Sequence, residues 1–307
     1  MAKTADRLLE GLKRRGIVPS SQPLFTDTDF LAVADDVIQE SLVPLLIAIR
    51  QDFFVTTTSV TTTAARAEYD IPYRAIGRTL RDLKRVDSGG TTKDMALIAL
   101  EDEHLFQSSA TTHSFYFKGD KIVVVPPPTT STMTLQMWWE CPPSRLVTED
   151  QAGVVASSTA TTVTLASVPS TITSGTKVDF VQGKSGNSLL AMDKTVVSVA
   201  GTTLTLASGD IPTSLASGDY VSAAETSPVI MLPNECYPLL ESLTAKRILV
   251  ALGDIDGGKI LDDAIAAGEK NLKMLLEPRV KGEATIIINR KGLLRSARLP
   301  YRRGIVY

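Results

Sequence analysis

Residues 161–181, TTVTLASVPSTITSGTKVDFV, and residues 202–222, TTLTLASGDIPTSLASGDYVS, are two copies of one sequence pattern. The copies begin about 41 residues apart, and a valine-rich run precedes each of them. Each copy indicates a strand, a turn, a strand, a proline-containing loop and a further strand, because β-branched residues suit a pleated surface. Two copies of a three-strand unit predict a small β-barrel or sandwich, whereas a solenoid requires more copies.

The segments on either side of this repeat have helical periodicity. Residues 4–16 place three leucines on one stripe, and residues 26–54 continue the pattern until Pro44, which is expected to kink or split the helix. After the repeat, residues 238–253 predict a helix with Pro238 in its first turn. Residues 256–279 predict a second helix that Pro278 ends.

Strands are also expected before the repeat. Threonine-rich residues 55–71 favour extended structure, and residues 114–128 predict a hairpin around Gly119-Asp120. A third strand is expected over residues 132–140, where Trp138 and Trp139 point to opposite faces. The predicted class is therefore α+β: a helical core made of N- and C-terminal helices, a strand and hairpin region, and an inserted all-β domain.

Four sections follow from these patterns. They are residues 1–146 as the first part of the core, 147–232 as the inserted domain, 233–278 as the second part of the core, and 279–307 as an extended basic arm. Cys141 and Cys236 flank the insert, and the ends of an inserted domain usually lie close together. The two cysteines are therefore expected to be thiols that could be neighbours without being bonded.

The bulk composition is that of an ordinary globular protein. The chain has 307 residues, of which 43% are hydrophobic and 21% charged, with a formal net charge of −2. No apolar run reaches the roughly 18 residues needed to span a bilayer, so no membrane partner is expected and the protein is expected to be made in the cytoplasm. Any electrostatic function must come from charge asymmetry within the chain.

Charge is indeed distributed unevenly along the chain. Residues 142–237 carry four basic and eight acidic residues, whereas residues 273–307 carry nine basic and two acidic ones. The tail mixes its cations with aliphatic and aromatic residues, a composition that favours docking on another subunit over a solvated tail. The residues predicted to make this contact are Arg290, Lys291, Leu293, Leu294, Arg295, Arg298, Leu299, Tyr301, Arg302 and Arg303.

A second basic cluster lies in residues 71–87, IPYRAIGRTLRDLKRVD. At about 100° per residue its arginines share one side of a helix, opposite to Ile76, Leu80 and Leu83. A short amphipathic helix is therefore expected, although Gly77 opposes it by about 1 kcal/mol. The arginine stripe would consist of Arg74, Arg78, Arg81 and Arg85.

Signatures of catalysis are missing from the sequence. It contains no phosphate-binding glycine loop, no dinucleotide-binding fingerprint, no zinc-protease motif and no nucleophile elbow. Two histidines and two cysteines at these spacings do not make a zinc site. We therefore expect no catalytic residue, no cofactor and no metal, although two carboxylates brought together by the fold could still act on a glycan.

Four stretches together resemble the head-to-tail adaptor, or connector, proteins of tailed bacteriophages. They are YDIPYRAIGRTLRDLKRVD (69–87), FYFKGDKIVVVPPP followed by TLQMWWECPPSRLV (115–128 and 134–147), GDYVSAAETSPVIMLPNECYPLLESLTAKRILVALGD (218–254) and EPRVKGEATIIINRKGLLR (277–295). The β insert is less typical of that family.

The resemblance implies a virion neck protein that assembles as a ring, commonly of twelve copies, beneath the portal protein. The helices would form the ring core, the C-terminal arm would embrace the portal, and the distal β parts would support tail, nozzle or fibre-bearing proteins. Double-stranded DNA would pass through the channel without sequence-specific contacts. A repeated arginine stripe would then give a strong local field, facing either that DNA or an acidic surface of the next subunit.

Two other classes of protein stay open from sequence alone. One is a different tail, baseplate or fibre-attachment protein whose β repeat binds a partner or a glycan. The other is a cell-wall or glycan hydrolase.

Overall fold

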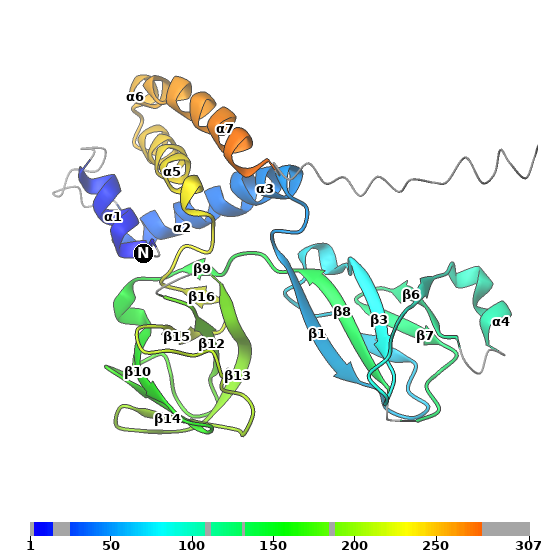
Figure 1. Ribbon diagram of the computed structural model, residues 1–307. Helices are drawn as coiled ribbons and strands as arrows, with labels where there is room; N and C mark the ends of the chain where they lie inside the picture. Colours follow the sequence, from blue (N-terminus) through cyan, green and yellow to red (C-terminus); the bar gives the residue numbers. More distant parts are fainter. Residues whose placement is uncertain (1–2, 15–24, 108–111, 131–132, 184–187, 278–307) are drawn as a thin grey trace, which may run out of the picture. The chain divides into compact units, whose positions relative to one another are not determined.

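The computed structural model describes residues 3–14, 25–107, 112–130, 133–183 and 188–277 (Figure 1). Residues 1–276 form one compact unit, and residues 277–307 are a separate one. The first unit contains helices and several sheets, so the predicted α+β class is confirmed. Its helical elements are α1 (Ala5–Arg14), α2 (Asp27–Val37), a π-helical turn (Ile38–Leu42), α3 (Val43–Ile49), α4 (Glu103–Phe106), α5 (Tyr237–Ala251), α6 (Ile255–Ile260) and α7 (Asp262–Leu276).

Local sequence explains how the first long helical run begins and bends. Thr26 and Asp29 form a reciprocal capping box that satisfies free backbone donors at the start of α2. Pro44 has no N–H to continue the α-helical ladder, and the π-helical turn lies just before it. The interruption expected near Pro44, as a kink or a split, is present as this π-helical turn between α2 and α3. The second C-terminal helix, predicted as one piece, is divided into α6 and α7 at Leu261.

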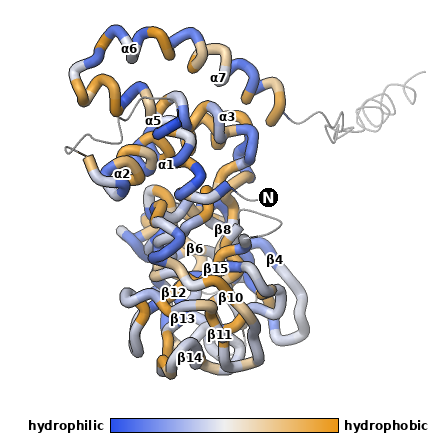
Figure 2. Tube along the Cα trace, turned by 90° about the vertical axis from the view of Figure 1, so that its left-hand side faces the viewer, coloured by the Kyte–Doolittle hydropathy of each residue, from blue (hydrophilic) through white to orange (hydrophobic). Residues whose placement is uncertain are grey.

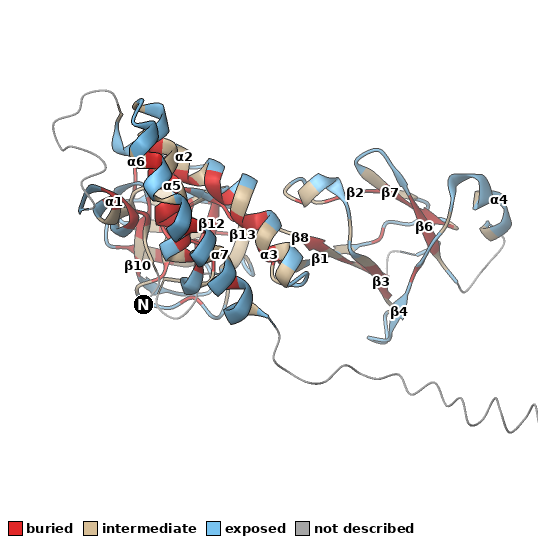
Figure 3. Ribbon diagram, turned by 90° about the horizontal axis from the view of Figure 1, so that it is seen from above, coloured by how far each residue is buried: buried red, intermediate tan, exposed pale blue. Residues whose placement is uncertain are grey.

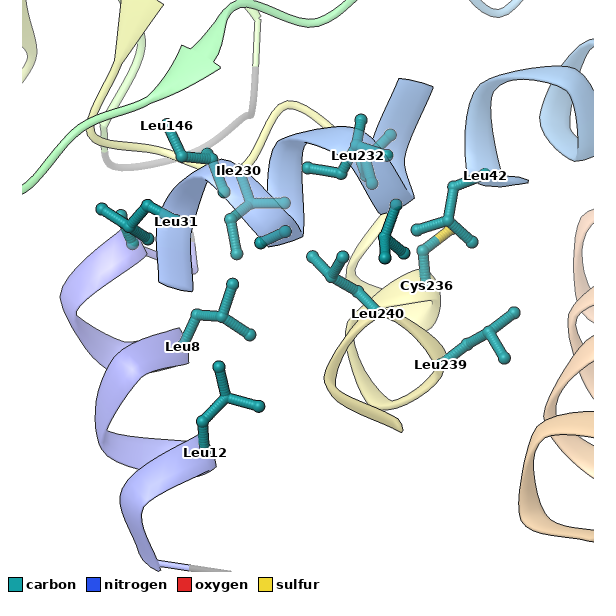
Figure 4. Packing of buried hydrophobic residues seen from close by; sticks show 14 of the residues in the cluster. Leu8, Leu12, Leu31, Leu42, Leu146, Ile230, Leu232, Cys236, Leu239 and Leu240 are labelled. Atoms are coloured by element: carbon teal, nitrogen blue, oxygen red, sulfur yellow. The ribbon is translucent and has the colours of Figure 1, made fainter. Parts of the chain in front are cut away.

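The helices share one hydrophobic cluster (Figure 4). Leu8 and Leu12 of α1 face the same interior as Leu31 of α2 and Leu240 of α5. Helix α5 packs against α1, α2, α6 and α7, so it has apolar contacts on several sides. This central position explains why even Glu241, Ser242 and Thr244 of α5 are buried.

Two four-stranded sheets follow α3 in the chain. The first has the order β1 (Val55–Thr61), β8 (Thr134–Glu140), β3 (Asp82–Val86), β4 (Thr92–Asp94), and the second β2 (Glu68–Asp70), β7 (Lys121–Val125), β6 (Ser114–Lys118), β5 (Ala96–Leu97). Alternate residues of both β8 and β3 are buried, whereas the edge strand β1 has no buried residue (Figure 3). Trp139 is 2% exposed in the core, whereas Trp138 lies on the other face, as predicted.

The helix predicted within residues 71–87 is wrong. Only Ile76–Arg78 is helical, as a single 3₁₀ turn, and Gly77 and Arg78 adopt positive φ angles of 62° and 53°, which end it. The chain then enters β3, which pairs with β8. The strand is favoured because Leu83 becomes fully buried among the residues of that sheet's core. Helical periodicity in the arginines was therefore coincidental.

Two architectures were predicted for the repeat, a small barrel and a sandwich, and the structure shows the barrel. Six antiparallel strands close in the order β10 (Gly153–Ser158), β11 (Thr162–Leu165), β14 (Thr203–Leu206), β13 (Leu189–Ala200), β12 (Lys177–Val181), β15 (Tyr220–Ala223). Hydrophobic and polar residues alternate in β11 and β14, and Figure 2 shows hydrophobic positions spread through the barrel strands. The inward residues form a separate cluster that includes Val163, Phe180 and Leu204. Closure pairs both edges of the barrel strands, so the barrel presents no long open edge for pairing with another chain.

The connections on either side of the barrel lie next to each other. Strand β9 (Arg145–Leu146) and strand β16 (Thr226–Ser227) form a parallel pair. Both cysteines are free thiols, but Cys236 is buried in the helical cluster whereas Cys141 packs against the sheet cluster. The assignment of residues 147–232 to an inserted domain is our interpretation of this arrangement.

Candidate functional site

The loop of residues 71–78 is the most unusual polar feature of the described chain. It follows β2 and is tightened by two backbone hydrogen bonds, from Ala75 N–H to the Pro72 carbonyl (2.9 Å) and from Arg78 N–H to the Ala75 carbonyl (3.0 Å). Ile71 and Ala75 are buried, which fixes the loop against the sheet core. Arg74 projects from this loop, and its side chain is only 6% exposed.

Arg74 binds two aspartates of the barrel. Its guanidinium donates to both carboxylate oxygens of Asp179, at 2.8 Å and 3.1 Å, and also to Asp193 Oδ1 at 2.9 Å. Tyr73 accepts from Arg74 Nε at 3.2 Å and donates to Asp193 Oδ1 at 2.6 Å. Glu225 lies 4.0 Å from Arg74 Nε, at the edge of the same cluster. This group of five residues is called the arginine network below.

Asp179 is the centre of the arginine network. It lies in β12 and has no exposed surface. Besides Arg74, it accepts backbone hydrogen bonds from Asp193 (2.9 Å) and Glu225 (3.0 Å). Both of those residues have positive φ angles, 56° and 66°, which non-glycine residues rarely adopt. One buried carboxylate thus holds two strained turns of the barrel as well as the arginine of a loop that precedes the barrel in sequence.

The ionisation of the network favours permanent charge on the arginine. Burial alone would lower the pKa of Arg74, but the hydrogen bonds and negative charge of Asp179 outweigh it and raise the pKa above its ordinary value. Burial, together with the hydrogen bond to Asp193, raises the pKa of Tyr73 to about 12. Neither group loses a proton near neutral pH. The network is therefore an ion-pair lock centred on Arg74 and Asp179.

The four arginines predicted to form one stripe do not share one face of a helix. Arg81 donates to the Gln51 carbonyl and lies 3.3 Å from Glu140, whereas Arg85 is buried and pairs with Asp87 at 3.3 Å. Arg78 is exposed at the left-handed turn. Three of the four arginines thus have acidic partners within the chain. The predicted portal-binding residues, Arg290 to Arg303, lie outside the described residues.

A half-buried carboxyl lines a pocket beside the network. Asp35 of α2 accepts two hydrogen bonds from the Leu146 N–H of β9, at 2.9 Å and 3.1 Å. Burial raises the pKa of Asp35 to about 7, although the Leu146 bonds and the charge of Arg145 act in the opposite direction. Asp35 and Arg74 line the same pocket, together with Glu225 and Arg145. This pocket has charges of both signs.

Sequence reasoning missed the acidic partners of Arg74. The available signal was Asp179 itself, an acid inside the apolar strand KVDFV, because a buried carboxylate needs a cation or several hydrogen-bond donors. Its donors come from residues 14 to 105 positions away, and one sequence does not reveal such distant pairings.

Metal-binding clusters and membrane-spanning helices are both absent from the described ranges. There, no three histidine, cysteine or acidic side chains are grouped so as to hold a metal ion. No described helix has the length and hydropathy needed to cross a membrane.

Comparison with known protein families identifies a relationship for this chain. The family model described as SU10 adaptor protein matches residues 4–172, which is more than half of the chain and includes both sheets and the first barrel strands. No curated protein matches the chain.

Proposed function

Because this chain belongs to the SU10 adaptor protein family, a family of bacteriophage head-to-tail adaptors, we propose that it forms a ring that attaches to the portal protein and carries the tail. Membership of this family establishes that the protein is a structural adaptor of the virion. Portal attachment, twelve copies, contact with tail, nozzle or fibre-bearing proteins, and a channel for double-stranded DNA are the proposed refinements. The family match over residues 4–172 is the observation that carries them.

The arginine network supports such a role. An adaptor holds several partners in fixed geometry, so its parts must resist displacement relative to each other. Arg74 joins the loop of residues 71–78 to the barrel through a bidentate pair, the most directional of ionic contacts. A buried pair is costly to break because each charge would be left uncompensated. This argues for a fixed attachment of the barrel.

The network also argues against hydrolysis by this carboxylate pair. Asp179 and Asp193 are close enough to share Arg74, but both already accept hydrogen bonds from its guanidinium. A glycoside hydrolase needs one carboxyl as a proton donor and a second one free to act on the sugar or on water. We therefore favour the structural role.

The basic surfaces keep distinct proposed roles. Residues 290–303 are proposed to bind the portal through their aliphatic anchors and arginines. Of the predicted stripe, Arg78 is the residue proposed to face the channel DNA or a neighbouring subunit. Arg74, Arg81 and Arg85 are better explained by their internal acidic partners.

The test uses the full chain and the portal protein of the same phage. The complete chain is expected to form rings by mass photometry and to co-sediment with the portal. A chain ending at Asn289 is expected to keep its circular dichroism spectrum and melting temperature but to lose portal binding. Replacing Leu293, Leu294 and Leu299 with serine separates the aliphatic anchors from the cations. Full portal binding by the shortened chain would exclude residues 290–303 as the portal-binding arm. Absence of the protein from the particle neck would exclude the proposed adaptor function.

A further inference from the structure

Helix α7 (Asp262–Leu276) has one side that packs against the helical cluster and a second side that does not. Ile265 and Leu272 are its buried residues, and both belong to that cluster. At about 100° per residue, a second set of residues lies within about 60° of one another and about 120° from the buried pair. This set is called the α7 stripe below, and it consists of Ile260, Ala264, Ala267 and Asn271. All four are exposed, and Figure 3 shows most of α7 as exposed.

Ile260 ends α6, but it is in phase with α7. Leu261 keeps right-handed helical angles (φ −81°, ψ −12°), and Ile265 N–H donates to its carbonyl at 2.9 Å. The members of the α7 stripe are separated by four, three and four residues, which is the spacing of the a and d positions of a heptad. The two alanines at its centre would let a second helix approach closely, since side-chain size sets the distance between helix axes. Spacing and size both indicate a helix as the partner.

Two charged residues, Asp263 and Lys270, flank the α7 stripe on the same side. They are seven residues apart, so both occupy the g position of the heptad pattern. The neighbouring Asp262 already has a partner, because it pairs with Lys246 of α5 at 2.5 Å. Within the part of the chain that the structure describes, neither Asp263 nor Lys270 forms an ion pair. Two opposite charges beside the stripe are therefore available to an outside partner.

These charges select a second copy of α7 as the partner and also select its direction. In an antiparallel pair of heptad helices the g positions face each other, so Asp263 of each copy faces Lys270 of the other. In a parallel pair the g positions face e positions, which here are Leu261, Gly268 and Leu275 and carry no charge. Only the antiparallel pairing of α7 with itself compensates both charges.

The sizes of the stripe residues match in the same arrangement. Placing Asp263 beside Lys270 of the other copy sets Ala264 of one copy against Ala267 of the other. Ile260 then lies against Asn271 of the other copy. The small residues meet where the helices cross, and the longer side chains lie at both ends. Each contact occurs twice, because the pair has two-fold symmetry.

We propose that, away from the portal, two copies of this protein pair through α7, packed antiparallel along the α7 stripe. Such an isologous contact closes on itself, so it differs from the head-to-tail contacts of the ring proposed above. One helix pair is a small interface, of the size found in weak and transient complexes, so a dissociation constant in the micromolar range is expected. The pairing needs neither the ring nor the portal.

A charge exchange tests the partner and its direction together. Asp263→Lys sets two cations against each other at both ends of the contact, and Lys270→Asp does the same with two acids, so each variant should weaken the dimer about tenfold. The double variant restores opposite charges only in the antiparallel pair, and its dissociation constant should return to within about twofold of the original. Sedimentation velocity of the full chain without portal protein, over a concentration series, measures each constant. A double variant that dimerises as weakly as the single variants would overturn the proposal.

Two neighbouring alanines provide a matched control. Ala267→Glu places a carboxylate in the centre of the proposed contact and should raise the dissociation constant at least about tenfold, because a buried unpaired charge is costly. Ala266→Glu adds the same side chain at an exposed position about 100° around the helix and should change the constant less than about twofold. Both alanines are exposed in the single chain, so both variants should keep its melting temperature. Equal effects of the two variants would contradict the pairing.

Cysteine trapping reads the register. A mixture of Ala264→Cys and Ala267→Cys chains should form an inter-chain disulfide on oxidation, above the background that Cys141 and Cys236 give in the unaltered chain. Met274→Cys alone should give none, because the two copies of residue 274 lie about 25 Å apart along an antiparallel pair. A cross-link at Met274→Cys, or a chain that is monomeric at every concentration, would overturn the proposal. Loss of portal binding by Ala267→Glu in a monomeric chain would assign the stripe to the portal instead, and would leave the adaptor function standing.

Discussion

The arginine network makes one quantitative prediction about stability. Arg74→Met keeps the length and apolar stem of the side chain but removes the charge. Asp179, which has no exposed surface, would then keep two backbone donors and lose its cation. Breaking a buried pair from one side costs about 3–5 kcal/mol because the remaining charge is uncompensated. For a unit of this size that corresponds to a fall in Tm on the order of 10 °C.

The assay is thermal and urea unfolding of the full chain, followed by circular dichroism. Arg78→Gln is the matched control, because it removes a nearby exposed arginine charge and should change stability by no more than about 0.5 kcal/mol. The double variant Arg74→Met with Asp179→Asn should lose less than the sum of the single losses, by at least about 1.5 kcal/mol. If Arg74→Met unfolds within about 1 kcal/mol of the unaltered chain, the network does not hold the barrel as argued.

Three further predictions concern other parts of the described chain. Because the pKa of Asp35 is raised, its contribution to stability is full below about pH 3.8 and is lost as pH rises through about 7. The free energy of unfolding of Asp35→Asn should therefore increase by about 2 kcal/mol relative to that of the unaltered chain between pH 4 and pH 8. Urea unfolding at both pH values measures this difference. Burial raises the pKa of Cys141 to about 11, so iodoacetamide should modify it roughly 100-fold more slowly at pH 8 in the folded chain than in the urea-unfolded chain, as followed by mass spectrometry. A Cβ on Gly183 would lie 2.4 Å from the backbone oxygen of Gly218, so Gly183→Ala should destabilise the barrel by about 1–3 kcal/mol in thermal melts, whereas Gly89→Ala, with open space around it, should not.

Local signals in the sequence were sufficient for most elements. The hairpin at Gly119-Asp120, the split at Pro44 and the barrel formed by the repeat each follow from turn chemistry, a missing N–H or a repeated pattern. The failure at residues 71–87 has a physical cause. Arg85 is buried with Asp87, so a charged side chain occupied an inward position of a strand, and the hydrophobic pattern pointed to a helix instead.

The candidate site was less accessible to sequence reasoning. From sequence, Arg74 was named only as one member of a stripe of arginines near it in the chain. Its partners Asp179 and Asp193 are more than 100 residues away in sequence. An ion pair between residues so far apart produces no periodic pattern in the sequence. A buried acid in an apolar strand shows that a partner exists, but only the fold identifies it.

The parallel pair of β9 and β16 has a consequence for exchange between phage genomes. Since the chain enters and leaves the barrel at adjacent strands, a recombination event could replace the barrel as a cassette without moving the remaining elements. Arg74 restricts which cassettes are compatible. A donor barrel without an acid at the place of Asp179 would leave the buried guanidinium without its bidentate partner. Viable hybrids should therefore inherit the arginine and its aspartate together, or lose both.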